Sequence, residues 1–185
     1  MSLFLLFACG EIQAQAKKVQ RAAIAAKEEA ARPKVQCDGT FDTEPPHGCI
    51  SGEIHCGDVI DGTTVGGDSN WDDDFYSGAF CFTAGLRHSA SERVYDLKVP
   101  AHTAVDIRMD SDCVDLDVAA AAWKYEGSCP DTHHTIPECE GDTDKGGGRI
   151  HLEVFNPREF LVAVDGKNGA TGPFRLTVVC GPLAH

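Results

Sequence analysis

Basic residues are scarce in this chain, and long apolar runs are absent from it. Among the 185 residues, Lys and Arg number 16 and Asp and Glu number 29, so the formal net charge at pH 7 is −13. Electrostatic binding of nucleic acid needs a basic face, so this balance predicts that nucleic acid is not a partner. A transmembrane helix needs about 18 or more consecutive apolar residues, and the sequence contains no such run.

Catalytic motifs are also missing. The sequence has no Gly-x-Ser-x-Gly, His-Glu-x-x-His, P-loop or Gly-x-Gly-x-x-Gly pattern. The nearest approach to the first of these begins at Gly67 and fails at its last position, where Trp71 stands. We therefore predict that the protein is not an enzyme.

Cysteine, in contrast, is abundant. Nine cysteines are a high share for a chain of this length, and that share is typical of proteins in an oxidising compartment outside the cytoplasm. We predict that the following eight form disulfides: Cys37, Cys49, Cys56, Cys81, Cys113, Cys129, Cys139 and Cys180.

The spacing of these eight cysteines does not determine how they pair. Cys129 and Cys139 are the candidates for a local disulfide, because they flank a loop that contains no other cysteine. Cys180 ends the last predicted strand, so we expect it to bond Cys49 or Cys56 near the start of the domain. A zinc site is the alternative, but structural zinc sites usually contain a Cys-x2-Cys pair, and none occurs here.

The composition changes near residue 36, which divides the chain into two parts. Residues 1–36 are rich in Ala, Gln and Lys and carry a formal charge of +3. Residues 37–185 carry 10 Lys and Arg against 26 Asp and Glu, a formal charge of −16, and hold 18 of the 19 glycines. We therefore predict an N-terminal arm followed by one acidic, disulfide-rich domain over residues 37–185.

The stretch Leu6-Phe7-Ala8-Cys9 is similar to the lipobox of bacterial lipoproteins, whose cysteine sulfur carries a diacylglycerol. The match departs from that pattern because no Lys or Arg precedes the apolar run. The run is also shorter than the roughly 7–15 residues of a usual signal core. We predict that residues 1–9 are a lipoprotein signal and that a lipid on Cys9 anchors the chain to a membrane. The alternative is an unprocessed apolar end that packs onto another surface.

Residues 11–32 have the composition of a helix. They contain no Gly or Pro and are rich in strong helix formers, and Pro33 would end the helix. Apolar residues recur at alternating spacings of four and three, as in a coiled coil, but most of them are Ala. We predict that residues 10–36 form a helical spacer. The alternative is a homo-oligomer assembled through residues 11–32.

The sequence of the acidic domain predicts an all-β, antiparallel β-sandwich or jelly roll of eight or nine short strands. Strict alternation of apolar and polar residues marks strands with one buried face and one face in water. Such alternation occurs at 94–99, 105–109, 114–118 and 150–154. An apolar run at 160–164 predicts a central strand, and residues 174–179 predict a last one. Further candidates are 50–60 and 79–83, whereas the alanines within 118–124 permit helix or strand.

The order of these signals resembles the bacterial pre-peptidase C-terminal domain family. The similar pieces are an early Gly-Thr turn near Gly62, a strand that begins Glu92-Arg93-Val94-Tyr95, and a second strand over 115–118. A third strand over 160–166 and a closing one over 172–176 complete the match, which covers roughly residues 50–181. The resemblance implies a β-sandwich on a secreted or surface protein. No peptidase domain accompanies the match, so it does not imply proteolysis.

Aspartates gather in three places, and one of them suggests a metal. Calcium takes six to eight oxygen ligands from flexible loops, most often carboxylates. Asp110, Asp112 and Asp115 lie around Cys113 with a spacing that lets one loop offer several carboxylates to one ion. We predict calcium as a cofactor at these three residues. The alternative is that the acidic loops are simply solvated and keep the domain soluble.

Aromatic residues crowd the segment from Trp71 to Phe80, next to the carboxylates of residues 72–74. Exposed aromatic rings beside carboxylates suit sugar binding, so Trp71 and Tyr76 are our candidate ligand contacts; the alternative is that these rings point into the core. The sequence thus predicts a non-catalytic lipoprotein at the bacterial outer membrane, at the cell surface or in the periplasm, whose sandwich binds a glycan or a protein. The alternative function is a structural subunit of a surface array or filament assembled through the N-terminal helix.

Overall fold

The computed structural model describes residues 34–39, 41, 49–82, 85–125, 129–130 and 134–183. From Val35 onward the chain forms one compact unit. The predicted lipidation of Cys9, the signal over residues 1–9 and the helix over residues 11–32 lie outside the described residues.

The described residues form nine strands and one short helix, as follows in chain order: β1 Gly52–Ile54, β2 Val59–Thr63, α2 Asp73–Gly78, β3 Arg93–Val99, β4 Thr103–Asp110, β5 Leu116–Trp123, β6 Cys139–Asp142, β7 Gly147–Val154, β8 Arg158–Gly166 and β9 Pro173–Pro182. The prediction of an all-β fold with eight or nine strands is confirmed. The alternating segments at 94–99, 105–109 and 150–154 all lie within strands.

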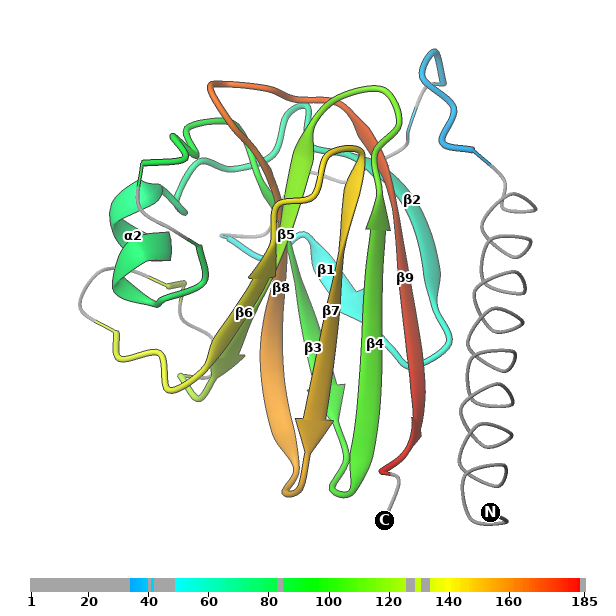
Figure 1. Ribbon diagram of the computed structural model, residues 1–185, viewed down its shortest axis with the longest axis vertical. Coiled ribbons are helices and arrows are strands. Elements are labelled where there is room, and N and C mark those ends of the chain that lie inside the picture. Colours follow the sequence, from blue (N-terminus) through cyan, green and yellow to red (C-terminus); the bar gives the residue numbers. More distant parts are fainter. Residues whose placement is uncertain are drawn as a thin grey trace, which may run out of the picture. The chain divides into compact units, whose positions relative to one another are not determined.

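The strands form two sheets that face each other as a sandwich (Figure 1). The five-stranded sheet has the order β1-β3-β8-β5-β6, and the four-stranded sheet has the order β2-β9-β4-β7. All pairings between these strands are antiparallel except that of β1 with β3, which is parallel. Every second side chain of each long strand points between the sheets. Those side chains form the main hydrophobic core, with Leu97, Ile107, Val162, Phe174 and Leu176 among its members.

The outer face of the five-stranded sheet is covered by a second apolar layer. Helix α2 lies on the side of β6 in Figure 1, and its Phe75 and Tyr76 belong to a buried cluster with Ala119, Ala121 and Leu161 of the sheet. Both faces of β5 are therefore buried along its whole length. This explains the run of alanines at 119–122, which are small enough to pack on both sides. It also means that the second face of this strand, predicted to be in water, is inside the protein.

Helix α2 was not predicted, and residues 79–82, described as turns and bends, do not form the predicted strand. Asp72 is the N-cap of the helix, because its Oδ1 accepts the backbone N–H of Phe75 at 2.9 Å. Asp73 and Asp74 fall in its first turn, where carboxylates are favoured by the helix dipole. The three consecutive aspartates at 72–74 were therefore the sequence signal for the start of this helix, although the helix is too short to show helical periodicity.

All eight predicted cysteines of the domain are paired, which confirms the disulfide prediction. The pairs are Cys37–Cys113, Cys49–Cys129, Cys56–Cys180 and Cys81–Cys139. Cys180 was expected to bond Cys49 or Cys56, and it bonds Cys56. The expected local pair of Cys129 with Cys139 is wrong, because Cys139 begins β6 and faces Cys81 in the layer around α2.

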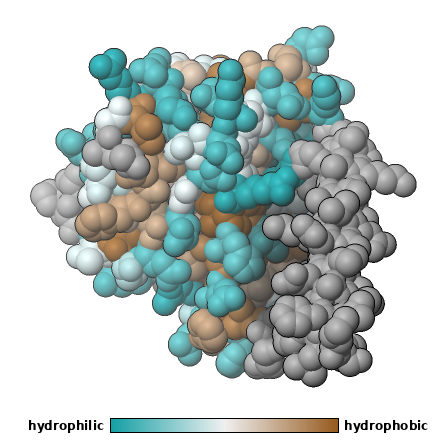
Figure 2. Space-filling view, in the orientation of Figure 1, coloured by the Kyte–Doolittle hydropathy of each residue, from teal (hydrophilic) through white to brown (hydrophobic). Residues whose placement is uncertain are grey.

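The outer face of the four-stranded sheet carries charged side chains that pair across strands. Arg175 of β9 donates to Asp61 of β2 from Nε at 2.7 Å and from Nη2 at 2.8 Å. His151 of β7 lies 2.7 Å from Asp106 of β4 through Nδ1 and Oδ1. In Figure 2 the apolar patches of the described surface are interrupted by hydrophilic side chains. Within the described ranges, no helix is both long enough and apolar enough to cross a membrane.

Candidate functional site

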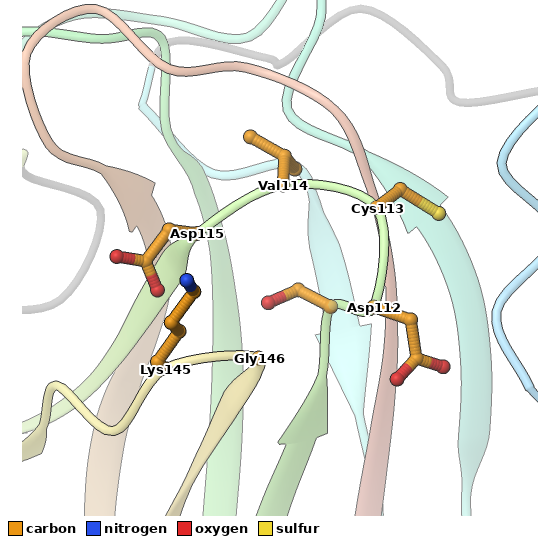
Figure 3. A pocket seen from close by; sticks show the side chains of 7 residues that line it. Asp112, Cys113, Val114, Asp115, Lys145 and Gly146 are labelled. Atoms are coloured by element: carbon orange, nitrogen blue, oxygen red, sulfur yellow. The ribbon is translucent and has the colours of Figure 1, made fainter.

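Three loops meet at one end of the sandwich, in the upper part of Figure 1: β4–β5, β6–β7 and β8–β9. The first two of them enclose a pocket of about 200 Å³ (Figure 3). Its lining residues are Ser111, Asp112, Cys113, Val114, Asp115, Lys145 and Gly146. Ligand pockets for whole small molecules measure roughly 300–1,000 Å³, so this pocket fits one side chain or one sugar ring.

The walls of this pocket are held together by backbone and disulfide bonds. The N–H of Ser111 donates to the carbonyl of Gly146 at 2.9 Å, which joins the two loops directly. Gly147 follows with a φ of +138°, and a Cβ at this position would lie 2.1 Å from the carbonyl oxygen of Met109. Only glycine permits so close an approach. Cys113 in the pocket wall is bonded to Cys37, which ties the β4–β5 loop to the chain before β1.

The three aspartates of the predicted calcium site have different partners and do not converge. Asp110 Oδ1 accepts from Arg108 Nε at 2.7 Å, and Asp112 Oδ2 accepts the backbone N–H of Val35 at 3.3 Å. In Figure 3 the carboxylate of Asp112 points away from Asp115. Over the described part of the chain, no group of three or more His, Cys, Asp or Glu side chains is placed to hold a metal ion. The structure therefore brings Asp112 and Asp115 to one pocket but not to one coordination sphere.

Asp115 is the pocket-lining carboxylate that has a buried oxygen without a hydrogen-bond partner among the described residues. Its Oδ2 lies 3.8 Å from Lys167 Nζ, a long ion pair. Its Oδ1 is shielded from solvent and has no hydrogen-bond partner among the described residues. The Asp115 side chain is nevertheless 43% exposed, so a ligand in the pocket would meet the accessible part of the carboxylate rather than Oδ1. Lys145, on the facing turn, is the one basic residue of the pocket lining.

Lys167 connects Asp115 to a buried polar network beneath α2. Its Nζ lies 3.0 Å from Oδ1 of Asp117, whose Oδ2 lies 2.8 Å from His88 Nε2. Asp117 is 0% exposed and His88 2% exposed, so the pair is sealed from water. On its other side, His88 Nδ1 lies 3.5 Å from Asp73 Oδ1. Although partial burial raises the pKa of Asp73, hydrogen bonds from the backbone N–H groups of His88 and Arg87 lower it overall.

A second buried carboxylate lies opposite Asp117 on the neighbouring strand. Asp165 is the register partner of Asp117 in the β5–β8 pairing. Its Oδ2 accepts from the hydroxyl of Tyr76 at 2.9 Å, and its Oδ1 accepts the N–H of Gly166 at 2.6 Å. Burial raises the pKa of Asp165 to about 7 and outweighs these two hydrogen bonds, which lower it. Burial likewise raises the pKa of Glu92, although the backbone N–H groups of Asn70 and Trp71 donate to it.

The network makes the stability of the domain depend on pH through Asp165. Its pKa in the folded protein, about 7, exceeds the unfolded value of about 3.9, so the folded state binds more protons between these values. The stabilisation is complete below about pH 4 and is lost as the pH rises through about 7.

We therefore expect Asp165→Asn to flatten the dependence of the unfolding free energy on pH between about pH 5 and 8, and to stabilise the protein at the upper end of this range. Asparagine resembles the protonated acid, since its oxygen accepts from Gly166 and its amide donates to Tyr76. Urea titrations across this range measure the effect. Parallel curves for the variant and the wild type would contradict it.

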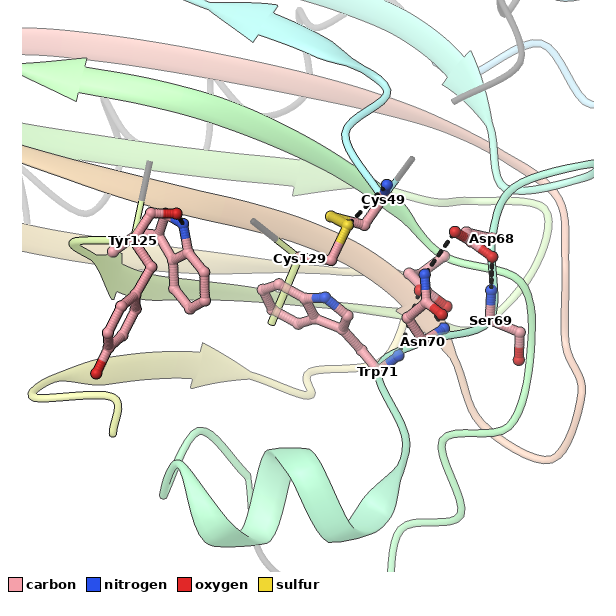
Figure 4. Close-up of a disulfide and its surroundings, with 9 residues drawn as sticks. Cys49, Asp68, Ser69, Asn70, Trp71, Tyr125 and Cys129 are labelled. Carbon is pink, nitrogen blue, oxygen red and sulfur yellow. Dashed lines mark hydrogen bonds between the residues drawn. A yellow bond between two sulfur atoms is a disulfide. The ribbon is translucent and has the colours of Figure 1, made fainter. Parts of the chain in front are cut away.

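Neither Trp71 nor Tyr76 presents a surface to a glycan, which corrects the predicted ligand contacts. Each is 1% exposed, because both side chains pack between α2 and the five-stranded sheet. Figure 4 shows Trp71 beside the Cys49–Cys129 disulfide, at the point where its backbone leads into α2. The buried Asp117, Asp165 and His88 were missed. An available signal was an aspartate inside or directly after an apolar run, at 117 and 165.

Three described Asp–His pairs differ in their surroundings, and His55–Asp58 is an exposed pair of residues three apart in the chain, at 3.4 Å. The His88–Asp117 pair is sealed from water, so a substrate cannot reach it. The exposed His151–Asp106 pair lies on the outer face of the four-stranded sheet, where the register neighbours of Asp106 and His151 supply no serine or cysteine beside the imidazole. Nucleophilic catalysis needs a nucleophile within hydrogen-bond reach of its base.

No family model matches the sequence, and no curated protein matches it. Among solved structures, similar chains include the pre-peptidase C-terminal domain of a collagenase from Bacillus anthracis, with 13% identity over 74% of this chain and 99% of that chain, and a TM-score of 0.44. A periplasmic inhibitor of g-type lysozyme from Aeromonas hydrophila gives 10% identity, 70% and 99% coverage, and a TM-score of 0.41. A surface-associated copper-binding protein from Methylomicrobium album BG8 gives 9% identity, 72% and 99% coverage, and a TM-score of 0.45.

These similarities concern the fold alone. The family that the sequence motifs resemble is represented among them by the collagenase domain. The class of the protein follows from its own structure: a β-sandwich with four disulfides, which is typical of an extracytoplasmic domain.

Proposed function

We propose that this chain is a non-catalytic binding module at the bacterial cell surface or in the periplasm. We further propose that the pocket between the β4–β5 and β6–β7 loops, called here the loop-end pocket, receives a cationic group. The observation that carries the proposal is Asp115, which lines the pocket with a side chain that is 43% exposed and whose Oδ2 makes a long ion pair of 3.8 Å with Lys167. An ammonium or guanidinium group in the pocket would donate to this accessible part of the carboxylate and match its charge.

Two further features support a cationic ligand. Residues 37–185 carry a formal charge of −16, which attracts positively charged partners and speeds their association. The pocket is also held in shape before binding, by the Ser111–Gly146 hydrogen bond and the Cys37–Cys113 disulfide. A preformed site loses less entropy when a ligand binds. The ligand is therefore the side chain of a basic protein segment or the amine of an amino sugar.

The proposal is tested by titrating the isotope-labelled protein with an acetylated tri-lysine amide and following the amide signals of residues 111–115 and 144–146. We expect saturable shifts at these positions. Chitosan trimer and its fully N-acetylated counterpart replace the peptide in parallel titrations, so that an amine on a sugar is compared with an amine on a peptide. If none of the amine-bearing probes gives saturable shifts at these positions, the proposal is rejected.

Substitutions in the pocket have opposite expected effects. Asp115→Asn should weaken binding of the cationic probe by about three- to tenfold, as expected for loss of a partly exposed charged hydrogen bond. Lys145→Ala should strengthen binding, because it removes a like charge. Asp74→Asn is the matched control, since Asp74 is an exposed carboxylate that does not line the pocket. Equal weakening by the variants at 74 and 115 would indicate net charge rather than a site.

The membrane anchor at Cys9, the helical spacer and the assembly of a filament through residues 11–32 stay predictions from the sequence. They complement the proposed function, because a lipid anchor would present the acidic domain to soluble or surface-bound partners.

A further inference from the structure

Phe80 is exposed although the aromatic side chains around it are buried. The segment 71–82 contains five aromatic residues, and four of them, Trp71, Phe75, Tyr76 and Phe82, lie in the apolar layer over the five-stranded sheet. Phe80, in contrast, is 87% exposed. A fully solvated phenylalanine gains nothing from the hydrophobic effect in the free protein.

The backbone holds this side chain outward in a conformation that phenylalanine disfavours. Phe80 has a φ of +59°, in the left-handed region where bulky residues are rare. Cys81 N–H donates to Tyr76 O at 3.0 Å and Phe80 N–H donates to Ser77 O at 3.3 Å, the two hydrogen bonds of a Schellman motif. Phe80 thus occupies the position after the helix where glycine is usual. Backbone strain retained at an exposed residue points to a function rather than to folding.

The residues on both sides of Phe80 fix its position. Ala79 and Cys81 are buried in the layer around α2, and Cys81 is bonded to Cys139 at the start of β6. The ring therefore cannot turn inward without breaking this helix end or pulling its neighbours out of the core. Such a rigid, protruding aromatic ring suits insertion into a pocket on a partner, because little side-chain freedom is lost on binding.

The charges at the start of α2 indicate the kind of partner. Asp74 and the N-cap Asp72 are exposed and Asp73 is partly exposed, whereas the exposed Arg87 contacts this helix through its N–H to Asp73. A second copy of the chain would bring its own excess of negative charge, and an anionic membrane would repel the surface. A protein with an apolar pocket and a basic rim is complementary in both respects.

We propose that Phe80 is the anchor of a protein-docking surface on the α2 side of the sandwich, and that it inserts into an apolar pocket with a basic rim on a partner protein. Phe80 is not among the residues that line the loop-end pocket, so this surface does not depend on the cation site proposed above.

The first test places p-benzoylphenylalanine at position 80 of the full chain in the cells that produce it, followed by irradiation and mass spectrometry of adducts. Phe155 is the matched control position, because it is 61% exposed but lies in the turn between β7 and β8. We expect a discrete protein adduct from position 80 that position 155 does not give. The proposal would be overturned if position 80 gave no adduct or if both positions gave the same adduct. An adduct with a second copy of the chain or with a lipid would also overturn it.

The second test uses the purified adduct partner and isothermal titration calorimetry. We expect Phe80→Ala to raise the dissociation constant at least about tenfold, as for an interface hot spot, and Phe155→Ala to change it less than about twofold. Added salt should weaken binding of the wild type. An unchanged dissociation constant for Phe80→Ala would reject the anchor. Asp115→Asn is measured alongside, so that loss of binding through the loop-end pocket is distinguished from loss through Phe80.

A third measurement needs no partner. Phe80→Gly and Phe80→Asn suit the left-handed backbone, so their urea midpoints should equal or exceed that of the wild type. A clear fall in both midpoints would show that Phe80 supports the fold instead, and would overturn the assignment.

Discussion

Replacing Asp117 with alanine should lower the free energy of unfolding by about 3–5 kcal/mol, the usual result of removing one partner from a buried charged pair. His88 Nε2 and Lys167 Nζ would both lose the carboxylate that lies 2.8 and 3.0 Å from them. His88 is sealed between Tyr76 and Phe82, with ring centroids 4.7 and 4.6 Å away, so water cannot replace the lost acceptor. Urea unfolding at neutral pH measures the change.

An exposed Asp–His pair serves as the control, because its removal shows how much stability is lost when such a contact is broken without burial. Asp106→Ala removes the carboxylate that lies 2.7 Å from His151, but Asp106 is 68% exposed and water can solvate the imidazole instead. We expect this control to lose less than about 1 kcal/mol. Similar losses in the two variants would mean that the network beneath α2 does not hold this layer onto the sheet.

Removing the Cys56–Cys180 disulfide by a double alanine substitution should have an effect of comparable size. This bond closes the longest loop of the four, with a sequence separation of 124, and joins the chain just before β2 to the end of β9. In the chain-entropy model, a loop of this length corresponds to about 4–5 kcal/mol of stabilisation. Both cysteines are replaced so that no free thiol remains to form a wrong pair.

The control for this prediction is the double substitution of Cys81 and Cys139, whose separation is 58. The same model expects a loss that is smaller by about 0.7 kcal/mol. The control variant should also loosen the layer around α2, which hydrogen exchange at residues 73–82 would detect. Urea midpoints of the Cys56–Cys180 variant within error of the wild type would contradict the prediction.

Much of the fold could be predicted from the local pattern of the sequence. Alternation of apolar and polar residues placed β3, β4 and β7 correctly because one face of each strand points into the main core. The Asn168-Gly169 dipeptide, a turn signal in the sequence, has positive φ at both residues and lies in the connection between β8 and β9, which belong to different sheets. Each of these features depends on neighbours in the chain.

The buried polar network and the position of the aromatic residues were not predictable in this way. Periodicity shows that Asp117 lies on the opposite face of its strand from Val118, but not whether that face is in water or beneath another layer. The segment that covers it, residues 71–82, is distant in sequence and lacks a helical repeat. For the same reason Trp71 and Tyr76 were expected at the surface, whereas the exposed ring is that of Phe80.

Composition and short-range spacing were enough to predict the all-β class, the acidic charge of the domain and the presence of eight paired cysteines. They were not enough to predict which cysteines pair, that Asp110, Asp112 and Asp115 diverge, or that Asp115 shares a pocket with Lys145. These outcomes depend on which distant segments the two sheets bring together. Burial on both faces of β5 in turn decides which charges meet water and which must find a partner inside.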